Sequence, residues 1–327
     1  MHALVGDIGG TNARLRLVDL GGTGPAVAEH TWTTSDHPAF ENVVEAAIEE
    51  FSAQDVSICC LAVAGPVIEG RVELTNASWA IDAGSLRARF GFQDIEVVND
   101  FRAVGESISA LGTEDLLTIN DASRDPRSPA AVLGAGTGLG EAIVVYDDDR
   151  AVIVETEGGH CDFGPNDEDQ TELLGFLRKR YGHVSWERIL SGDGIVDVAR
   201  FFSARETGRS RESRFGTAVD VARGWERGDP IARDAIGLFV DVFGGEAGNL
   251  ALKCLPRAGV FLAGGIAAKN PQWFSDGRFM AAFTAKGRFA DLMRQFPVFL
   301  ITNESAGLIG ATEIARRLAA RTGETSR

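Results

Sequence analysis

The sequence predicts an α/β protein built from two related halves, on three observations. The chain opens with a short apolar strand, a glycine turn and a returning strand in which apolar and polar residues alternate. The same strand–turn–strand pattern returns 128 residues later, and helical periodicity dominates the segment from about residue 185 to residue 255. The residues that coincide at this offset are Gly6 with Gly134, Gly10 with Gly138, and Asp19 with Asp147. We expect two related β-hairpin domains that each offer a glycine turn to a shared cleft.

In the first part of the chain, apolar runs and turn residues mark the elements. The run 56–64 is continuously apolar and ends at Gly65-Pro66, which suits a buried central strand. The segment 38–51 carries its apolar residues on one stripe, which predicts a helix. The expected elements, in order, are strands at 4–8 and 13–20, a helix at 38–51, strands at 56–64 and 95–98, and a helix at 101–110.

In the second part, a hairpin is followed by helices and two late strands. Ser185 is expected to cap a helix that begins at Trp186. The charge-dense segment 205–214 is expected to be a solvated surface loop. The other expected elements are strands at 131–135 and 141–146, helices at 220–225 and 231–252, strands at 259–263 and 298–301, and a closing helix at 306–320.

Length and charge narrow the possible functions. The 327 residues suit two domains or one large one, and 44% hydrophobic with 24% charged residues is ordinary globular usage. The formal charge of −15 would repel a phosphate backbone, so no nucleic-acid partner is expected. The longest apolar stretch, 58–64, is far shorter than the ~18 residues of a membrane span.

The chain carries no feature of a secreted protein or of a metal-finger protein. No basic-then-apolar leader follows Met1, and the four cysteines have no metal-ligand spacing. We therefore expect a cytoplasmic protein with reduced thiols and no membrane partner. The cysteines are Cys59, Cys60, Cys161 and Cys254.

Several common nucleotide-binding and hydrolase motifs are absent from the sequence. No lysine follows a glycine, which excludes the P-loop motif, and no G-x-G-x-x-G occurs, which disfavours a Rossmann site. Three separate glycine turns at strand ends remain. Glycine lets backbone amides approach a phosphate, and threonine adds a hydroxyl donor, so the turns together predict phosphate binding, although any one alone could be structural. They consist of Gly9, Gly10, Thr11 and Asn12; Gly136, Thr137 and Gly138; and Gly264 and Gly265.

Two carboxylates at strand ends are candidates for chemistry. Asp7 would meet a cation or a donor there, and next to a phosphate it would act on Mg²⁺ through water; the alternative is a turn-capping aspartate. Asp100 follows Asn99 at the end of a strand and opens a helix. It could remove a proton from a substrate hydroxyl that attacks phosphorus, and its alternative role is a helix N-cap.

The segment Glu157-Gly158-Gly159-His160 predicts a tight turn that presents an acid and an imidazole to one side. With Glu187, Asn99 and Asp100 these side chains could form a sugar pocket, because sugar hydroxyls both donate and accept hydrogen bonds. Alone, His160 could be a structural histidine and Glu187 a helix acid that compensates the dipole. A metal site is disfavoured because Cys161 stands alone and the ligand count is short.

With these motifs assembled, the chain resembles the bacterial ATP-dependent glucokinases of proteobacterial type, within the actin-like sugar kinases. The resemblance extends from residue 4 to about residue 315. The matching stretches are 6–12, 62–66, 74–79 (Leu-Thr-Asn-Ala-Ser-Trp), 98–101, 134–140, 157–160, 189–192 and 262–266.

The resemblance implies an actin-like, ribonuclease-H-like fold with two domains that flank a cleft. A small α/β domain would comprise residues 1–110 and 301–327, and a large α+β domain residues 111–300. It also implies a homodimer and, because no cysteine cluster follows His160, no structural zinc.

The implied reaction is phosphorylation of the glucose 6-hydroxyl by ATP with Mg²⁺, feeding glycolysis. Asp100 would be the general base, and Asn99, Glu157, His160 and Glu187 would hold the other hydroxyls. Asp7 and the turns at 9–12 and 136–138 would hold the ATP phosphates and Mg²⁺, and Gly264-Gly265 would lie against the nucleoside. The alternatives are a kinase for another hexose, such as fructose, mannose or N-acetylglucosamine, and a non-catalytic sugar-sensing regulator.

Overall fold

The computed structural model describes residues 1–22, 26–74, 79–147, 150–207 and 214–325. Residues 75–78 of the stretch 74–79, and most of the expected surface loop at 205–214, lie outside this part of the chain. The chain divides into two compact units. The first comprises Met1–Gly112 and Ser305–Arg327, and the second comprises Thr113–Glu304.

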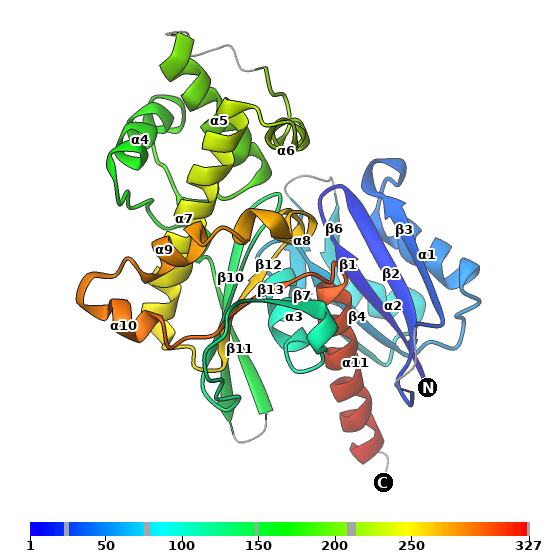
Figure 1. Ribbon diagram of the computed structural model, residues 1–327. Coiled ribbons are helices and arrows are strands. Elements are labelled where there is room, and N and C mark those ends of the chain that lie inside the picture. Colours follow the sequence, from blue (N-terminus) through cyan, green and yellow to red (C-terminus); the bar gives the residue numbers. More distant parts are fainter. Residues whose placement is uncertain (23–25, 75–78, 148–149, 208–213, 326–327) are drawn as a thin grey trace. The chain divides into compact units, whose positions relative to one another are not determined.

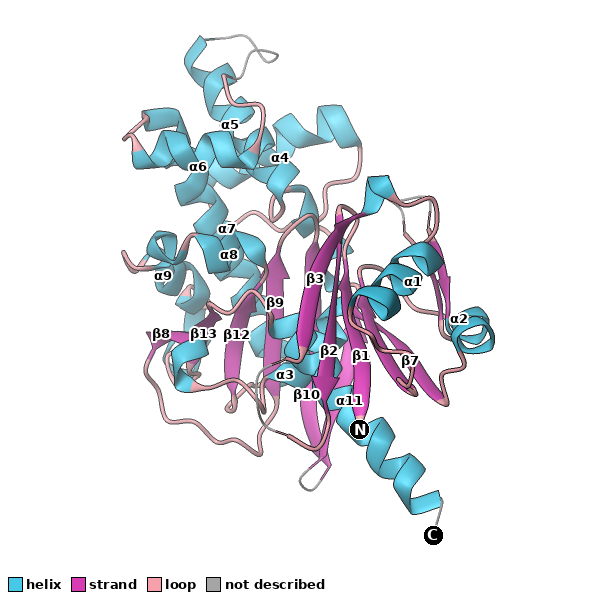
Figure 2. Cartoon of the chain, turned by 90° about the vertical axis from the view of Figure 1, so that its right-hand side faces the viewer, coloured by secondary structure: helices cyan, strands magenta, loops and turns pink. Residues whose placement is uncertain are grey.

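A five-stranded sheet forms the centre of the first unit, in the order β3-β2-β1-β4-β7. β1 pairs antiparallel with β2 and parallel with β4, and β2 and β3 continue the antiparallel edge (Figure 2). The strands are β1 His2–Ile8, β2 Asn12–Asp19, β3 Ala28–Thr33, β4 Ile58–Val63 and β7 Asp94–Asn99; a separate hairpin pairs β5 Arg71–Glu73 with β6 Ala80–Asp82. Every residue of β4 is buried, as its continuous apolar run predicts.

Helices cover both faces of this sheet. Neighbouring residues of a strand point to opposite sides, and in β4 the residues on both sides are buried. Leu61 of β4 belongs to the cluster that includes Phe40, whereas Cys60 belongs to the cluster that includes Leu308. The first face carries α1 Phe40–Glu50 and α2 Ala83–Phe90, and the second carries α3 Asp100–Ser107 and α11 Ala306–Thr325 (Figure 1).

Contact between α3 and α11 is close enough to exclude a side chain. A Cβ on Gly310 would lie 1.7 Å from the Ala103 carbonyl oxygen. Arg317 donates two hydrogen bonds to the buried Glu106 carboxylate, which raises the pKa of the guanidinium. The last helix is therefore an integral layer of the unit in which the chain begins.

The second unit repeats the same sheet topology. Its sheet has the order β11-β10-β9-β12-β13-β8, in which β9 pairs antiparallel with β10 and parallel with β12, as β1 does with β2 and β4. The strands are β8 Leu116–Asn120, β9 Ala130–Ala135, β10 Leu139–Asp147, β11 Arg150–Thr156, β12 Gly259–Ala263 and β13 Val298–Ile301. The internal repeat predicted from the sequence is present in the topology.

Gly6 and Gly134, which coincide in the repeat, each lie close to the parallel neighbouring strand. A Cβ on Gly6 would lie 2.8 Å from a methyl group of Leu61, and one on Gly134 would lie 2.6 Å from the Ala263 carbonyl carbon. At Gly134 the backbone of the parallel neighbour excludes any larger residue, whereas at Gly6 a larger residue would require the Leu61 side chain to move.

Helix α7 is the core of the helical layer in the second unit. It packs against α5, α6 and α9. It is long and apolar enough to span a membrane, but 78% of its most apolar window is buried inside the protein, as expected for a core helix. The helices are α4 Glu168–Tyr181, α5 Gly192–Thr207, α6 Ala218–Glu226, α7 Pro230–Cys254, α8 Gly265–Lys269, α9 Arg278–Thr284 and α10 Ala290–Met293.

The predicted helix start at Trp186 is wrong. Residues Trp186–Arg188 form a single 3₁₀ turn, and Ser185 makes no side-chain capping bond. The next helix, α5, begins at Gly192, where Ser191 accepts a hydrogen bond from the Gly194 amide. The Gly192 amide donates to the Gly136 carbonyl oxygen at 2.9 Å, so the helix begins in contact with the glycine turn.

Candidate active site

The first glycine turn is braced by its neighbours. The Gly9 amide donates to the Asn12 carbonyl oxygen at 2.9 Å across the turn. The Thr34 hydroxyl donates to the Gly10 carbonyl oxygen, and the Thr34 amide donates to that of Thr11, both at 2.9 Å. These bonds direct the two carbonyl groups toward Thr34 and fix the conformation of the turn.

Asp7 lies one residue before the end of β1, opposite Arg14 on β2. Burial raises the pKa of its carboxyl, and the Arg14 charge opposes that rise. A Cβ on Gly307 would lie 3.1 Å from the Asp7 Oδ2, so the carboxylate rests against the first turn of α11. A carboxylate oxygen held at a strand end is a ligand of the kind that hard cations prefer.

Asn99 and Asp100 stand where β7 passes into α3. The Asn99 Oδ1 accepts hydrogen bonds from the amides of Phe101 (2.9 Å) and Arg102 (3.3 Å), which makes Asn99 the N-cap of α3. Its Nδ2 donates to the Gly65 carbonyl oxygen at 3.1 Å. The capping role considered for Asp100 therefore belongs to Asn99. Asp100 is the first residue of the helix, and its Oδ1 accepts from the Phe101 amide.

The two remaining glycine turns lie together in the second unit. The Gly136 amide donates to the Gly138 carbonyl oxygen at 2.8 Å, which closes the turn between β9 and β10. Gly264 has φ +88°, and a Cβ there would lie 2.3 Å from the Ala135 carbonyl oxygen. At Gly136 and at Gly265 a Cβ would meet no atom within 4 Å, so both turns border open space.

Glu157, His160 and Glu187 form one cluster beside the Gly136–Gly138 turn. The His160 Nε2 lies 3.8 Å from the Glu157 Oε2, and its Nδ1 lies 3.9 Å from the Glu187 Oε1. The other Glu187 oxygen accepts a hydrogen bond from the Leu139 amide at 3.1 Å. A Cβ on Gly138 would lie only 2.3 Å from that oxygen, so this glycine admits Glu187 to the turn.

The two glycines of the Glu157–His160 segment permit close packing on β10. Residues Gly158–His160 form a 3₁₀ turn. A Cβ on Gly159 would lie 2.2 Å from the Leu139 carbonyl oxygen, and one on Gly158 would lie 2.0 Å from the Glu141 Oε2. The turn can therefore lie flat on the start of β10, which exposes the Glu157 and His160 side chains to solvent.

Glu141 is a residue of this region that sequence reasoning missed. It is 2% exposed, and its Oε1 has no hydrogen-bond partner among the described residues. Burial, with the charge of Glu246 on α7, raises its pKa to about 7, while Lys253 opposes the rise. The alternation of Leu139, Glu141 and Ile143 along β10, which directs Glu141 to the helix-covered face, was the available signal.

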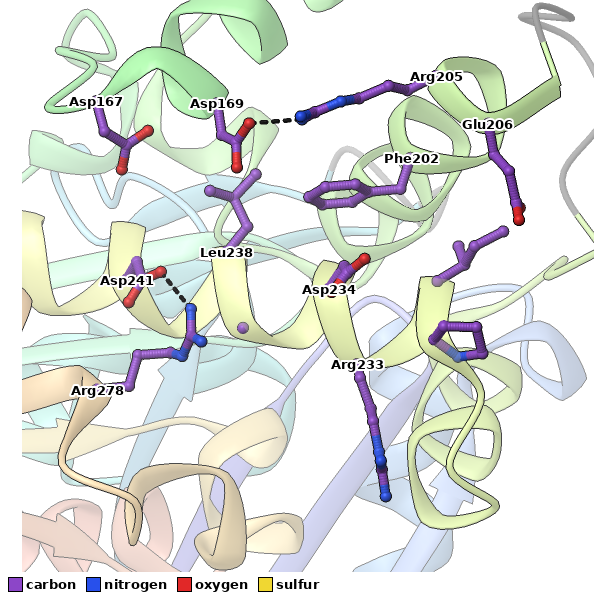
Figure 3. A pocket seen from close by; sticks show the side chains of 13 residues that line it. Asp167, Asp169, Phe202, Arg205, Glu206, Arg233, Asp234, Leu238, Asp241 and Arg278 are labelled. Atoms are coloured by element: carbon purple, nitrogen blue, oxygen red, sulfur yellow. Dashed lines mark hydrogen bonds and ion pairs between the residues drawn. The ribbon is translucent and has the colours of Figure 1, made fainter.

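A separate hollow in the second unit has a different character. This cavity of about 520 Å³ lies among α4, α5, α7 and the start of α9, and none of the predicted site residues lines it (Figure 3). Arg205 is paired with Asp169, and Arg278 with Asp241. Five acids and three arginines line the cavity, and two of the arginines are paired in this way, so the cavity is poorly suited to a phosphate.

Nothing in the described part of the chain gathers three or more His, Cys, Asp or Glu side chains that could hold a metal ion.

The predicted site residues divide between the units. Asp7, the turn at 9–12, Asn99 and Asp100 belong to the first unit, and the other predicted residues belong to the second.

Comparison with known proteins identifies the family. A family model described as glucokinase matches residues 4–318. The chain is 37% identical over 316 residues to a glucokinase of Yersinia pestis (strain Pestoides F), and 97% of each chain is covered. Among solved structures, a glucokinase from an Antarctic psychrotroph matches with a TM-score of 0.84 and 30% identity, over 97% of this chain and 99% of that one. A ROK family glucokinase from Streptomyces griseus in complex with glucose and AMPPNP matches with a TM-score of 0.66 and 20% identity, over 97% and 100% of the two chains. The chain has the fold of the actin-like sugar kinases and belongs to the glucokinase family of hexose-phosphorylating enzymes.

Proposed function

We propose that this protein transfers the γ-phosphoryl group of MgATP to the 6-hydroxyl of glucose, giving glucose 6-phosphate and ADP. The observation that carries the proposal is the double contact of Glu187. One of its oxygens accepts from the amide that follows the Gly136–Gly138 turn, and the other faces His160. A single carboxylate thus links a phosphate-type turn to a cluster suited to hydroxyl groups.

The sugar side of the reaction depends on paired acceptors and donors. Glu157 and Glu187 offer carboxylate oxygens to glucose hydroxyls, and His160 between them can donate or accept. The Asn99 amide has two N–H groups, and with one donated to Gly65 the other can donate to a hydroxyl. The capping bonds of Asn99 hold that amide in a fixed position.

The nucleotide side depends on backbone amides and Asp7. The turns at 9–12 and 136–138 would approach the phosphates, and Gly264-Gly265 would lie against the nucleoside, since a side chain is absent at each glycine. Asp7 would hold the magnesium of MgATP through water, and its oxygen donors suit that ion. The bound magnesium would supply charge neutralisation at the phosphates, and the residues of this chain would position the two substrates.

Asp100 would take the proton of the attacking 6-hydroxyl. Its place as the first residue of α3 favours a negative carboxylate, because the amino end of a helix carries partial positive charge. The solved relative that holds glucose and AMPPNP supports this substrate pair. We further infer that the protein is cytoplasmic, that it forms a homodimer and that its product feeds glycolysis. Light scattering would test whether it forms a dimer in solution.

Substitution of Asp100 by asparagine tests the proposal. We expect D100N to lose most of kcat while the glucose dissociation constant stays near that of the wild type, because the amide keeps the shape but cannot take the proton. D94N, at the opposite end of β7, is the matched control. Turnover of D100N at the wild-type rate would remove Asp100 from the base role.

A panel of hexoses distinguishes the other possibilities. ADP formation would be measured with MgATP and glucose, fructose, mannose or N-acetylglucosamine in turn. Highest kcat/KM with a sugar other than glucose would reassign the substrate. Glucose binding by calorimetry without ADP formation would indicate a sugar-sensing regulator instead.

A further inference from the structure

Glu141 holds the Glu157–His160 turn at two points. In the β10–β11 ladder it stands opposite Thr156, whose hydroxyl donates to the Glu141 carbonyl oxygen at 3.1 Å and accepts from the Gly158 amide at 3.3 Å. Its side chain reaches the same turn, because its Oε2 occupies the space in front of the Gly158 Cα. The Glu141 carboxyl group therefore packs against the buried side of the turn that carries Glu157 and His160.

Behind Glu141 lies a second buried acid with its own partners. Glu246 on α7 is almost fully buried, and its Oε2 accepts from the Asn249 Nδ2 at 2.8 Å. Lys253 lies 3.9 Å from the other Glu246 oxygen. Lys286 donates to the Gly245 carbonyl oxygen at 2.8 Å and to the Asn249 Oδ1 at 2.7 Å. Both lysines are therefore engaged around Glu246.

We propose that Glu141 is a positioning residue for the hexose, whose neutral form supports the Glu157–His160 turn and whose ionisation weakens hexose binding. The inference rests on the proposed function. Ionised Glu141 would place an unpaired charge in a buried site next to Glu246, at a cost that the neutral acid avoids. A sugar seated on the turn displaces water from above it, which increases that cost and favours the neutral form further.

The direction of the pH dependence follows from linkage. The Glu141 pKa of about 7 in the free protein is raised further by bound sugar, so binding takes up protons near pH 7. Below about pH 6 Glu141 is protonated in both the free and the sugar-bound protein, so affinity is constant. Above about pH 6, affinity falls as pH rises until Glu141 is ionised in both states. If bound sugar raises the Glu141 pKa by about half a unit, the glucose KM increases about threefold between the protonated and the ionised limits.

Other titratable groups face the same region and need a control. Glu246 and Lys253 on α7 face Glu141, with Lys286 beyond Glu246, and Glu157, His160 and Glu187 lie around the turn. All of them remain in the variant E141Q, which mimics the neutral acid. The difference between wild type and E141Q therefore isolates Glu141.

The test measures glucose KM from pH 6 to 8.5, at saturating MgATP, for the wild type, E141Q and the control E155Q. E155Q removes a neighbouring acid on β11, where Glu155 is exposed. We expect a rise of about threefold in wild type and E155Q and a smaller rise in E141Q. Calorimetry in buffers of different ionisation enthalpy should detect an uptake of about 0.3 proton on glucose binding that E141Q lacks.

A pH profile of glucose KM in E141Q that matches the wild type, or an unchanged proton uptake, would overturn the inference. Thermal melts check that E141Q folds; if it does not, E246Q provides the second variant. Removing the Glu246 charge lowers the Glu141 pKa, so the KM rise must move to lower pH, and an unmoved profile overturns the inference. Absence of hexose-dependent ADP formation by the wild type at every pH is a different result, which refutes the proposed function itself.

Discussion

Gly138 offers a direct test of the contact between the glycine turn and Glu187. In Gly138→Ala the new methyl carbon would lie 2.3 Å from the Glu187 Oε2, so the carboxylate must move and its hydrogen bond from the Leu139 amide is lost. Gly138 has no positive φ, so the substitution adds a steric contact without backbone strain.

The magnitude follows from the lost bond. A hydrogen bond to a charged group contributes roughly 1.5–3 kcal/mol, and the lower end applies because the Glu187 side chain is 28% exposed. A loss of about 1.5 kcal/mol corresponds to about a tenfold change in an equilibrium constant. We therefore expect the glucose KM of G138A to rise about tenfold, because Glu187 must be ordered anew on binding.

The assay is ADP formation with glucose varied at saturating MgATP, then with MgATP varied at saturating glucose. Gly136→Ala is the matched control, because its methyl group would meet no atom within 4 Å and its effects should fall on the ATP KM alone. An unchanged glucose KM in G138A, or equal changes in both variants, would refute the role assigned to Glu187.

Two further substitutions test the packing of the separate units. Glu106→Gln removes the acid that Arg317 holds between α3 and α11, and we expect it to lower the free energy of unfolding by about 2 kcal/mol, since Arg317 is partly solvated. Urea denaturation measures this, and Glu313→Gln on α11 should cost far less, because Glu313 is more exposed than Glu106. Asp197→Asn removes a buried acid that accepts from Arg180, Arg200 and the Tyr181 hydroxyl, at a cost of about 3 kcal/mol. The substitution should also lower the Tyr181 pKa, because burial and Asp197 together raise it in the wild type. Burial alone should still keep this pKa above its ordinary value. Ultraviolet titration of the phenol measures it, and an unchanged Tyr181 pKa would contradict the prediction.

Buried strands were the most predictable part of the fold. The strands β12 and β13 have the bounds that their apolar runs predict, because strands buried on both faces leave an unbroken signal. The edge strand β3 escaped prediction, since Trp32 is its one buried residue and no alternation results. Helix α4 escaped for a similar reason, with Leu173 and Leu177 its main apolar contacts with the core.

At the candidate site, residue types were predictable but their mechanical causes were not. Sequence reasoning selected Glu157, His160 and Glu187, which do lie together. It could not assign the N-cap to Asn99 rather than Asp100, because either residue type caps helices well. Nor could it explain Gly158, whose missing side chain makes room for a carboxyl group from another strand. Such close approaches depend on tertiary packing, which local pattern does not encode.

The placement of α11 bears on the order in which the protein can form during translation. The sheet of the first unit is synthesised early, yet the α11 side chains that help to cover one of its faces, from Leu308 to Leu318, are made only after the second unit. Until they emerge from the ribosome, an apolar surface centred on Val5, Cys60 and Val98 lacks the cover that α11 provides. The second unit, contiguous in the chain, can complete its core first, so nascent chains should engage chaperones through their amino-terminal sheet.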